Sequence, residues 1–196
     1  MMINRFFINF ISLKNGLLDL LHFFNSHCCF AHHTTKLCIL YEVVFCYHIV
    51  MKALIQRVKK AQVDIDGQTV GQINQGILAL IGIEREDSVE KAERLLNKIC
   101  RYRIFSDEAG KMNLSLNDIQ GELLLVSQFT LVAETQKGNR PGFSRGATPE
   151  HGELIFNQLV KLANNTGLSI QTGQFGADMQ VSLINDGPVT FWLETP

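Results

Sequence analysis

The chain has 196 residues and a mass of 22.1 kDa, which is enough for one domain with a sizeable core and too short for two ordinary domains with a linker. Eighteen basic against nineteen acidic residues give a formal charge of -1, which argues against binding nucleic acid mainly by bulk charge, so any RNA contact must be local. Five cysteines, four of them in the first fifty residues, exclude a disulfide framework spanning the chain and favour a reducing compartment.

The composition changes sharply near Met51. Residues 1–50 hold five of the six histidines and no proline, whereas residues 51–196 hold fourteen of the fifteen glycines and all four prolines. The residues typical of turns and exposed surfaces therefore lie mainly in residues 51–196. We expect residues 51–196 to form a single catalytic domain and residues 1–50 to be a non-native upstream extension that is disordered or poorly packed.

Two other interpretations of residues 1–50 stay open. One is a weak peripheral membrane anchor, although no stretch is long and apolar enough to span a bilayer and no secretory signal is evident. The other is a zinc site, although the spacing of the candidate ligands matches no paired-ligand pattern. These candidates are His22, His27, Cys28, Cys29, His32, His33 and Cys38.

From Met51 onward the local signals become regular. Residues 52–58 are apolar and β-branched and predict a strand, and Val63 and Ile65 continue an alternating pattern. Asp66-Gly67 is a hairpin turn signal, with 69–73 as the return strand. The continuous apolar run 76–83 predicts a strand buried on both faces.

A helix is predicted next. Apolar residues from Val89 to Tyr102 recur at helical intervals, and Asp87 and Glu90 have the spacing of a capping box. Cys100 falls on the apolar side of this helix and is expected to be a small core residue rather than a nucleophile.

The second half of the domain alternates strands and one more helix. Residues 122–132 predict a central strand, 134–148 a basic loop, and Thr148-Pro149 the start of a helix that ends at Gly167. Residues 179–183 alternate as a strand, 185–188 predict a turn, and 189–193 predict a returning strand. The whole predicts an α+β fold with mostly antiparallel β-sheets, barrel-like or layered, and two main helices packed on one side.

Few catalytic groups are available in residues 51–196. The domain holds one histidine, His151, at a predicted helix start, and one cysteine, so a Ser-His-Asp or Cys-His arrangement is poorly supplied. Phosphate-loop, HExxH and CxxC patterns do not occur in the sequence of these residues. We expect no metal and no cofactor.

Two polar islands interrupt the apolar strands: SQFTL at 127–131 and NDGPVT at 185–190. Together with MKALIQRV from Met51 and the KGNRPGFS loop at 137–144, they closely resemble the D-aminoacyl-tRNA deacylase (D-tyrosyl-tRNA deacylase) family across residues 51–196. The resemblance implies a cytoplasmic homodimer that hydrolyses the ester between tRNA and a D-amino acid or glycine, in translation quality control. It implies tRNA as partner and no membrane.

The resemblance also implies the site. The catalytic segment would comprise Ser127, Gln128, Phe129 and Thr130. A cis Gly187-Pro188 peptide would reach across the dimer interface and reject L-amino acids by steric exclusion. The pocket would involve Arg57, which holds the Gly-Pro element, with Phe175, Met179 and Asn185. The tRNA would contact Lys137, Arg140 and Arg145, with Lys59 and Lys60 as further candidates for phosphate contacts.

Alternatives remain for the mechanism and for the function. Thr130 is the family's often-proposed nucleophile, but its hydroxyl lacks an evident general base nearby in sequence. We therefore favour positioning of the ester, an oxyanion held by main-chain N–H groups near 128–130, and help from the vicinal ribose hydroxyl. The rival functions are a non-catalytic module that binds a D-amino acid or peptide, and a membrane-associated protein.

Overall fold

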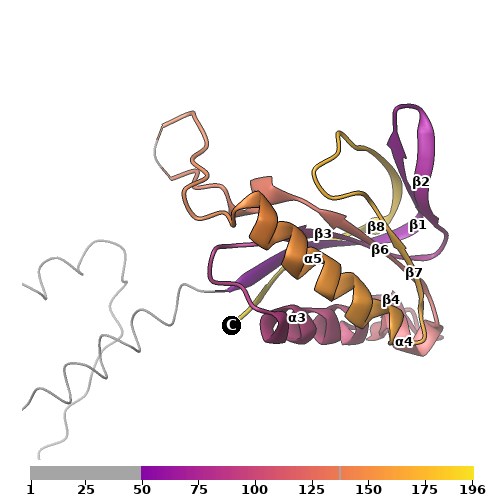
Figure 1. The fold of residues 1–196 in the computed structure, drawn as a ribbon. Helices are drawn as coiled ribbons and strands as arrows, with labels where there is room; N and C mark the ends of the chain where they lie inside the picture. The colour runs from indigo at the N-terminus through magenta and orange to yellow at the C-terminus, as the bar shows by residue number, and fades with distance from the viewer. Residues whose placement is uncertain (1–49, 137) are drawn as a thin grey trace, which may run out of the picture. The chain divides into compact units, whose positions relative to one another are not determined.

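A computed structural model describes residues 50–136 and 138–196. The predictions for residues 1–49, including the membrane anchor and the zinc site, therefore lie outside the described residues. The described residues form twelve elements in chain order (Figure 1). They are β1 (Met51–Ile65), β2 (Gln68–Ile73), β3 (Gly76–Gly82), α3 (Val89–Arg101), β4 (Phe105–Ser106), β5 (Met112–Leu114), α4 (Leu116–Ile119), β6 (Glu122–Ser127), the 3₁₀ turn η1 (Phe129–Val132), α5 (Pro149–Asn164), β7 (Ser169–Thr172) and β8 (Gln180–Thr195).

The long strand β1 organises the main sheet. It is one continuous strand that contains both the predicted strand 52–58 and the alternating residues Val63 and Ile65, and it pairs antiparallel with β2, β3 and β8. The hairpin to β2 turns at Asp66 (φ 50°) and Gly67 (φ 75°), as predicted. Two consecutive positive φ values are the geometry that a tight two-residue hairpin requires.

The main sheet is mixed, and the prediction of mostly antiparallel sheets is right only around β1. The strand order is β2-β1-β3-β6-β7, with β8 on β1, and the β3-β6 and β6-β7 pairs are parallel. Parallel neighbours need a crossover connection, usually a helix. α3 lies in the connection from β3 to β6, and α5 in the connection from β6 to β7.

The sheet curls into a nearly closed barrel. A Cβ atom built on Gly71 of β2 would lie 2.6 Å from the carbonyl oxygen of Thr172 in β7, so these two edge strands nearly touch. A separate apolar cluster occupies the side of the sheet that this curvature encloses. Its buried members are Val58, Ala61, Val63, Ile73, Leu78, Leu124 and Val126.

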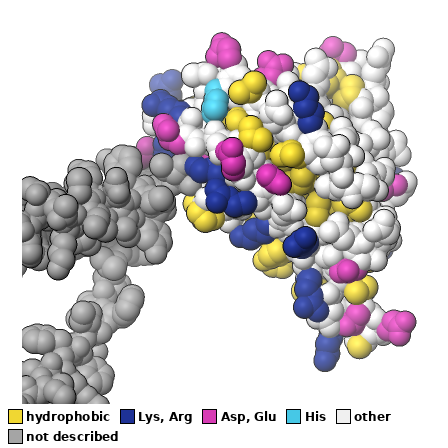
Figure 2. Space-filling view, turned by 60° about the horizontal axis from the view of Figure 1, so that its bottom comes forward, with side chains coloured by type: hydrophobic (Ala, Val, Ile, Leu, Met, Phe, Trp, Pro, Cys, Tyr) yellow, Lys and Arg dark blue, Asp and Glu magenta, His cyan; other side chains and the backbone are white. Residues whose placement is uncertain are grey.

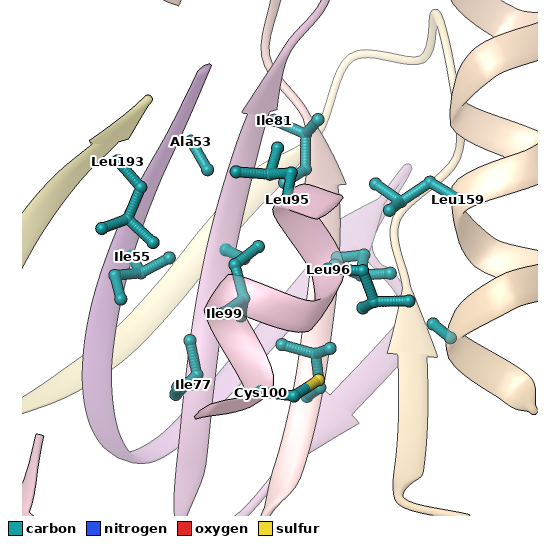
Figure 3. Packing of buried hydrophobic residues seen from close by; sticks show 14 of the residues in the cluster. Ala53, Ile55, Ile77, Ile81, Leu95, Leu96, Ile99, Cys100, Leu159 and Leu193 are labelled. Carbon is teal, nitrogen blue, oxygen red and sulfur yellow. The ribbon is translucent and has the colours of Figure 1, made fainter. Parts of the chain in front are cut away.

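The two main helices cover the other face of the sheet. α3 and α5 share one apolar cluster with β1, β3, β6 and β8, and in Figure 3 Leu95 and Ile99 of α3 point toward Ile77 and Ile81 of β3. Cys100 is buried in the same cluster, as predicted, and burial raises the pKa of its thiol to about 11.

The helix starts follow capping rules, with one correction. Thr148 caps α5, with Pro149 at its first position, as predicted. The cap of α3 is Ser88, whose hydroxyl accepts from the Lys91 N–H, and not Asp87. The Asp87 carboxylate instead accepts from the Glu84 N–H at 2.7 Å, because the chain turns one residue later than the sequence spacing indicated.

Candidate functional site

The predicted strand 122–132 ends early, at Ser127. Gln128 leaves the extended conformation (φ -141°, ψ 86°), and Phe129–Val132 forms the 3₁₀ turn η1. The Gln128 N–H still donates to the Ile81 carbonyl at 2.7 Å, so it is not available to a ligand. The N–H groups of Phe129 and Thr130 open the turn and have no acceptor within it. The polar island thus marks the end of a strand, with two backbone donors at its tip.

A cavity of about 460 Å³ opens beside this strand end. Its walls come from the ends of β3 and β6, the segment before α5, the first turn of α5 and the approach to β8. The residues that line it are Ile81, Ile83, Val126, Ser127, Gln128, Phe129, Val132, Phe143, Gly146, Ala147, Thr148, Pro149, Gly152, Phe175, Gly176, Ala177, Met179 and Val181. The lining is mainly apolar with few polar groups, as in small-molecule sites.

Aromatic rings stand on two sides of this cavity. Phe129 is 67% exposed and Phe143 is 43% exposed, and their ring centroids are 5.2 Å apart. Phe175 packs against Phe156 at 6.2 Å and lies close to Gly152, where a Cβ atom would approach its ring to 3.1 Å. The sequence analysis singled out Phe175 and Met179 as pocket residues but missed Phe143. The signal that could have indicated Phe143 is an aromatic residue in a glycine-rich loop.

Thr130 is exposed and lies outside the cavity lining. Its hydroxyl oxygen accepts a hydrogen bond from the side-chain amide of Gln128 at 2.6 Å. An amide donor cannot take a proton, and His151, the one histidine in the described part of the chain, has its Nε2 atom 2.9 Å from the Asp87 carbonyl oxygen. This geometry gives the Thr130 hydroxyl no general base among the described residues.

The predicted turn at 185–188 is wrong. Asn185 and Thr190 both belong to β8, which runs antiparallel to β1 on either side of the NDGP segment. Gln56 pairs with Thr190 and Val58 pairs with Asn185, so residues 186–189 bulge out opposite Arg57. The turn-forming residues serve a bulge here because β1 supplies a partner beyond them.

Side chains brace this bulge from both strands. Asn185 accepts from the Val189 N–H at 2.6 Å and donates to the Thr190 hydroxyl at 3.0 Å. Arg57 donates from Nε to the Asp186 carbonyl at 2.8 Å and from Nη1 to the Ile104 carbonyl at 2.6 Å. The bulge is therefore held at its base by one amide and one guanidinium.

Gly187 and Pro188 form the exposed tip of the bulge. The peptide bond between them is cis, as the resemblance implies. Gly187 has φ +149°, and a Cβ atom there would lie 2.6 Å from Cγ2 of Val189, so the position requires glycine. Neither residue lines the cavity of its own chain. Arg57 and Asn185 also lie at the bulge and not at the cavity.

The predicted tRNA contacts are only partly brought together. Arg140 is exposed and Arg145 is half-exposed, with Nη2 of Arg145 3.6 Å from Oε2 of Glu84, while Lys137 lies outside the described residues. Lys59 Nζ is 3.8 Å from Oδ1 of Asp186, and Lys60 lines a separate hollow of about 340 Å³. On the face drawn in Figure 2, basic and acidic side chains are interspersed, in keeping with the net charge near zero.

Residues 50–136 and 138–196 contain neither a cluster of metal-ligating side chains nor a helix that could span a membrane. This part of the chain has no group of three or more His, Cys, Asp or Glu side chains that could hold a metal ion. No helix within it has the length and apolar character needed to cross a membrane.

Fold and site together define the class: an α+β barrel domain with one apolar, aromatic-walled cavity at the end of a parallel strand and a braced Gly-Pro bulge elsewhere. The family model described as D-Tyr-tRNA(Tyr) deacylase matches residues 54–194. The chain belongs to this family.

Similar proteins cover the same region. The D-aminoacyl-tRNA deacylase of Alteromonas mediterranea is 60% identical over 141 residues, which are 72% of this chain and 97% of that protein. That of Proteus mirabilis is 61% identical over 144 residues, 74% of this chain and 99% of that protein.

Two solved structures are also similar. The structure titled c-Myc DNA Unwinding Element Binding Protein is 43% identical, with a TM-score of 0.71, over 74% of this chain and 99% of that one. A probable eukaryotic D-amino acid tRNA deacylase has a TM-score of 0.66 at 12% identity, over 74% of this chain and all of that one, and shows a shared fold.

Proposed function

We propose that the chain hydrolyses the ester bond of D-aminoacyl-tRNA and releases the free amino acid and tRNA. The observation that carries the proposal is the cavity at the end of β6 in a chain whose residues 54–194 match a deacylase family. A volume of about 460 Å³ falls within the roughly 300–1,000 Å³ of small-molecule sites, enough for the aminoacylated end of a tRNA rather than its body.

The chain's contribution to the reaction is mainly positional. The N–H group of Phe129, a residue that lines the cavity, and that of Thr130 next to it have no acceptor within η1, and we assign them as donors to the oxyanion that forms when water attacks the ester. The ribose hydroxyl next to the ester helps to activate that water. Thr130, whose hydroxyl bonds to the Gln128 amide, orients this turn and is not the nucleophile.

The Gly187-Pro188 tip supplies chiral selection in a homodimer. It is exposed and absent from its own cavity, so it reaches an active site only in a second copy of the chain. Placed there, its main-chain carbonyls occupy the space that an L side chain would need. D-aminoacyl and glycyl esters place no side chain in that space and are accepted.

Contacts with tRNA are local to the mouth of the cavity. Arg140 and Arg145, with Lys137, lie in the segment that leads from η1 to α5 and carries Phe143. A few phosphate contacts near the acceptor end suit a protein with a net charge of -1.

The catalytic unit is residues 51–196, and residues 1–50 are an extension that the reaction does not need. In support, 141 and 144 residues of this chain account for 97% and 99% of the length of the two bacterial relatives. Because aminoacylated tRNA is used in the cytoplasm, the proposal includes a cytoplasmic location.

The test is hydrolysis of D-Tyr-tRNA, L-Tyr-tRNA and Gly-tRNA by the full chain and by a chain that begins at Met51. We expect both proteins to deacylate the D and glycyl esters and to spare the L ester. Binding of D-Tyr-tRNA without turnover would instead favour the non-catalytic module. Loss of activity only in the shorter chain would refute the proposed domain boundary.

A further inference from the structure

Two carboxylates that this chemistry does not use are buried beside the cavity. Glu84 and Asp87 are 5% and 3% exposed, and both lie in the connection from β3 to α3. Taking a charged carboxylate out of water is unfavourable unless it is paired. Their partners therefore indicate what the two residues hold in place.

Glu84 joins the first strand of the sheet to the segment before α5. Lys52 of β1 donates from Nζ to Oε1 of Glu84 at 2.5 Å, and the Lys52 side chain is itself only 13% exposed. Nη2 of Arg145 lies 3.6 Å from the other carboxylate oxygen, Oε2. One buried carboxylate thus has a cation near each oxygen, one from β1 and one from the segment that leads into α5.

The backbones on either side of this ion pair are also bonded to each other. The Arg85 N–H donates to the Arg145 carbonyl at 3.2 Å, and the Ala147 N–H donates to the Ile83 carbonyl at 3.1 Å. Glu84 and Gly146 form an isolated antiparallel bridge. The contact is a short two-stranded clamp with the Glu84 carboxylate at its centre.

The clamped segment is part of the cavity. Gly146 and Ala147 line it directly, and the Gly146 N–H donates to the Phe143 carbonyl at 3.1 Å, which fixes the residue whose ring faces Phe129. Glu84 itself is not among the lining residues. Its influence on a bound ester passes through Arg145 and the segment 143–147.

We propose that Glu84 is a positioning residue, whose buried carboxylate holds the segment 143–147 against the core through Arg145 and so places one wall of the cavity. The inference rests on the proposed function. It assigns Arg145 a role within the chain, in addition to the tRNA contact that its exposed edge offers.

The kinetic test is a double-mutant cycle of Glu84→Gln and Arg145→Gln in the full chain, with D-Tyr-tRNA as substrate. Glutamine keeps the size of Glu84 and an acceptor for Lys52 but removes the charge that holds Arg145. We expect each variant to lower kcat/KM by about tenfold, because displacement of a cavity wall by about 1 Å is enough for such a loss. The double variant should fall no further than Arg145→Gln alone.

The results would differ if the only role of Arg145 were to contact a phosphate of the tRNA. Glu84→Gln would then have the kinetics of the wild type, while Arg145→Gln would reduce the slope of log binding against log salt by about 1. That pair of results, or effects of the two substitutions that multiply, would overturn the inference.

Asp118→Asn is the matched control for a loss of stability alone. It weakens the capping box of α4, because the charged carboxylate oxygen that accepts from the Ser115 hydroxyl at 2.7 Å becomes a neutral amide oxygen, and it lies at the opposite end of the domain from the clamped segment (Figure 1). We expect this variant to lower Tm without changing kcat/KM.

Amide hydrogen exchange without substrate makes the inference independent of activity. The Arg85 and Ala147 N–H groups, which bridge the clamp, should exchange faster in Glu84→Gln and in Arg145→Gln but not in Asp118→Asn. Unchanged exchange would refute the role of Glu84 even if the enzyme is active. If the wild type proved inactive, the proposed function would fail while the exchange data still decided whether Glu84 holds the segment. Should Glu84→Gln not fold, Arg145→Gln tests the same link from its exposed end.

Discussion

Replacing Arg57 by methionine tests whether the Gly-Pro bulge depends on a single side chain. Arg57→Met keeps the apolar stem but removes the donors to the carbonyls of Asp186 and Ile104. Hydrogen bonds from a charged group contribute about 1.5–3 kcal/mol each. Ile104 is buried and its carbonyl loses the full amount, whereas Asp186 is partly exposed and regains water, so we expect a total loss of about 3 kcal/mol.

The stability assay is thermal unfolding. For a domain of about 150 residues, 1 kcal/mol shifts Tm by roughly 2–4 °C, so Arg57→Met should lower Tm by about 6–12 °C. Lys59→Met is the matched control: Lys59 also faces Asp186, at 3.8 Å, but it is 68% exposed. Exposed ion pairs contribute about 0–1 kcal/mol, so the control should change Tm little.

The functional assay is the ratio of hydrolysis rates for D-Tyr-tRNA and L-Tyr-tRNA. If about half of the free energy lost in Arg57→Met, roughly 1.4 kcal/mol, had held the Gly-Pro tip in place, the ratio should fall roughly tenfold. We expect Arg57→Met to hydrolyse the L ester measurably and Lys59→Met to remain selective. An Arg57→Met protein with full selectivity, or with the Tm of the control, would refute the role given to this arginine.

Three further predictions concern other sites. Thr130→Ala should keep kcat within about tenfold of the wild type in single-turnover assays, because loss of a true nucleophile lowers kcat by about 10⁶-fold; a loss of that size with an intact fold would restore Thr130 as the nucleophile. Gly71→Val should unfold at lower urea concentration, since its Cβ would meet the Thr172 carbonyl at 2.6 Å, while Gly67→Asn, in an open turn, should not. Burial raises the pKa of Asp87 above 3.8, so its protonated form favours folding and stability is lost as pH rises through the raised pKa. The free energy of unfolding of the wild type, measured with urea relative to that of Asp87→Asn, should therefore be lower at pH 7 than at pH 4. The same difference between the two proteins at both pH values would contradict the raised pKa.

Local patterns were enough to predict most elements. The apolar stripes of α3 and α5, the capping residue of α5, the Asp66-Gly67 turn and the apolar run of β3 all depend on contacts between near neighbours in the chain. The two polar islands were also recognisable, because hydroxyl, amide and Gly-Pro groups within apolar strands require hydrogen-bond partners or a functional role. Their resemblance to a family indicated the activity before any geometry was known.

What each polar island does depended on strands far away in sequence. The pairing of β1 on both sides of residues 186–189 turns a predicted reversal into a bulge. The pairing of β3 with β6 ends at Ile81 and Ser127, and Gln128 leaves the strand directly after it. The parallel pairs likewise follow from where α3 and α5 pack, which periodicity cannot give.

The sequence alone therefore determined the positions of the two main helices and of most strands, and the motifs that carry the family. The tertiary structure decided the mixed barrel, the absence of the Gly-Pro tip from the lining of its own cavity, and the burial of Glu84 between Lys52 and Arg145. The physical reason is that turns, caps and periodicity arise from interactions within a few residues, whereas a bulge or a buried ion pair exists only when segments 30 to more than 100 residues apart meet.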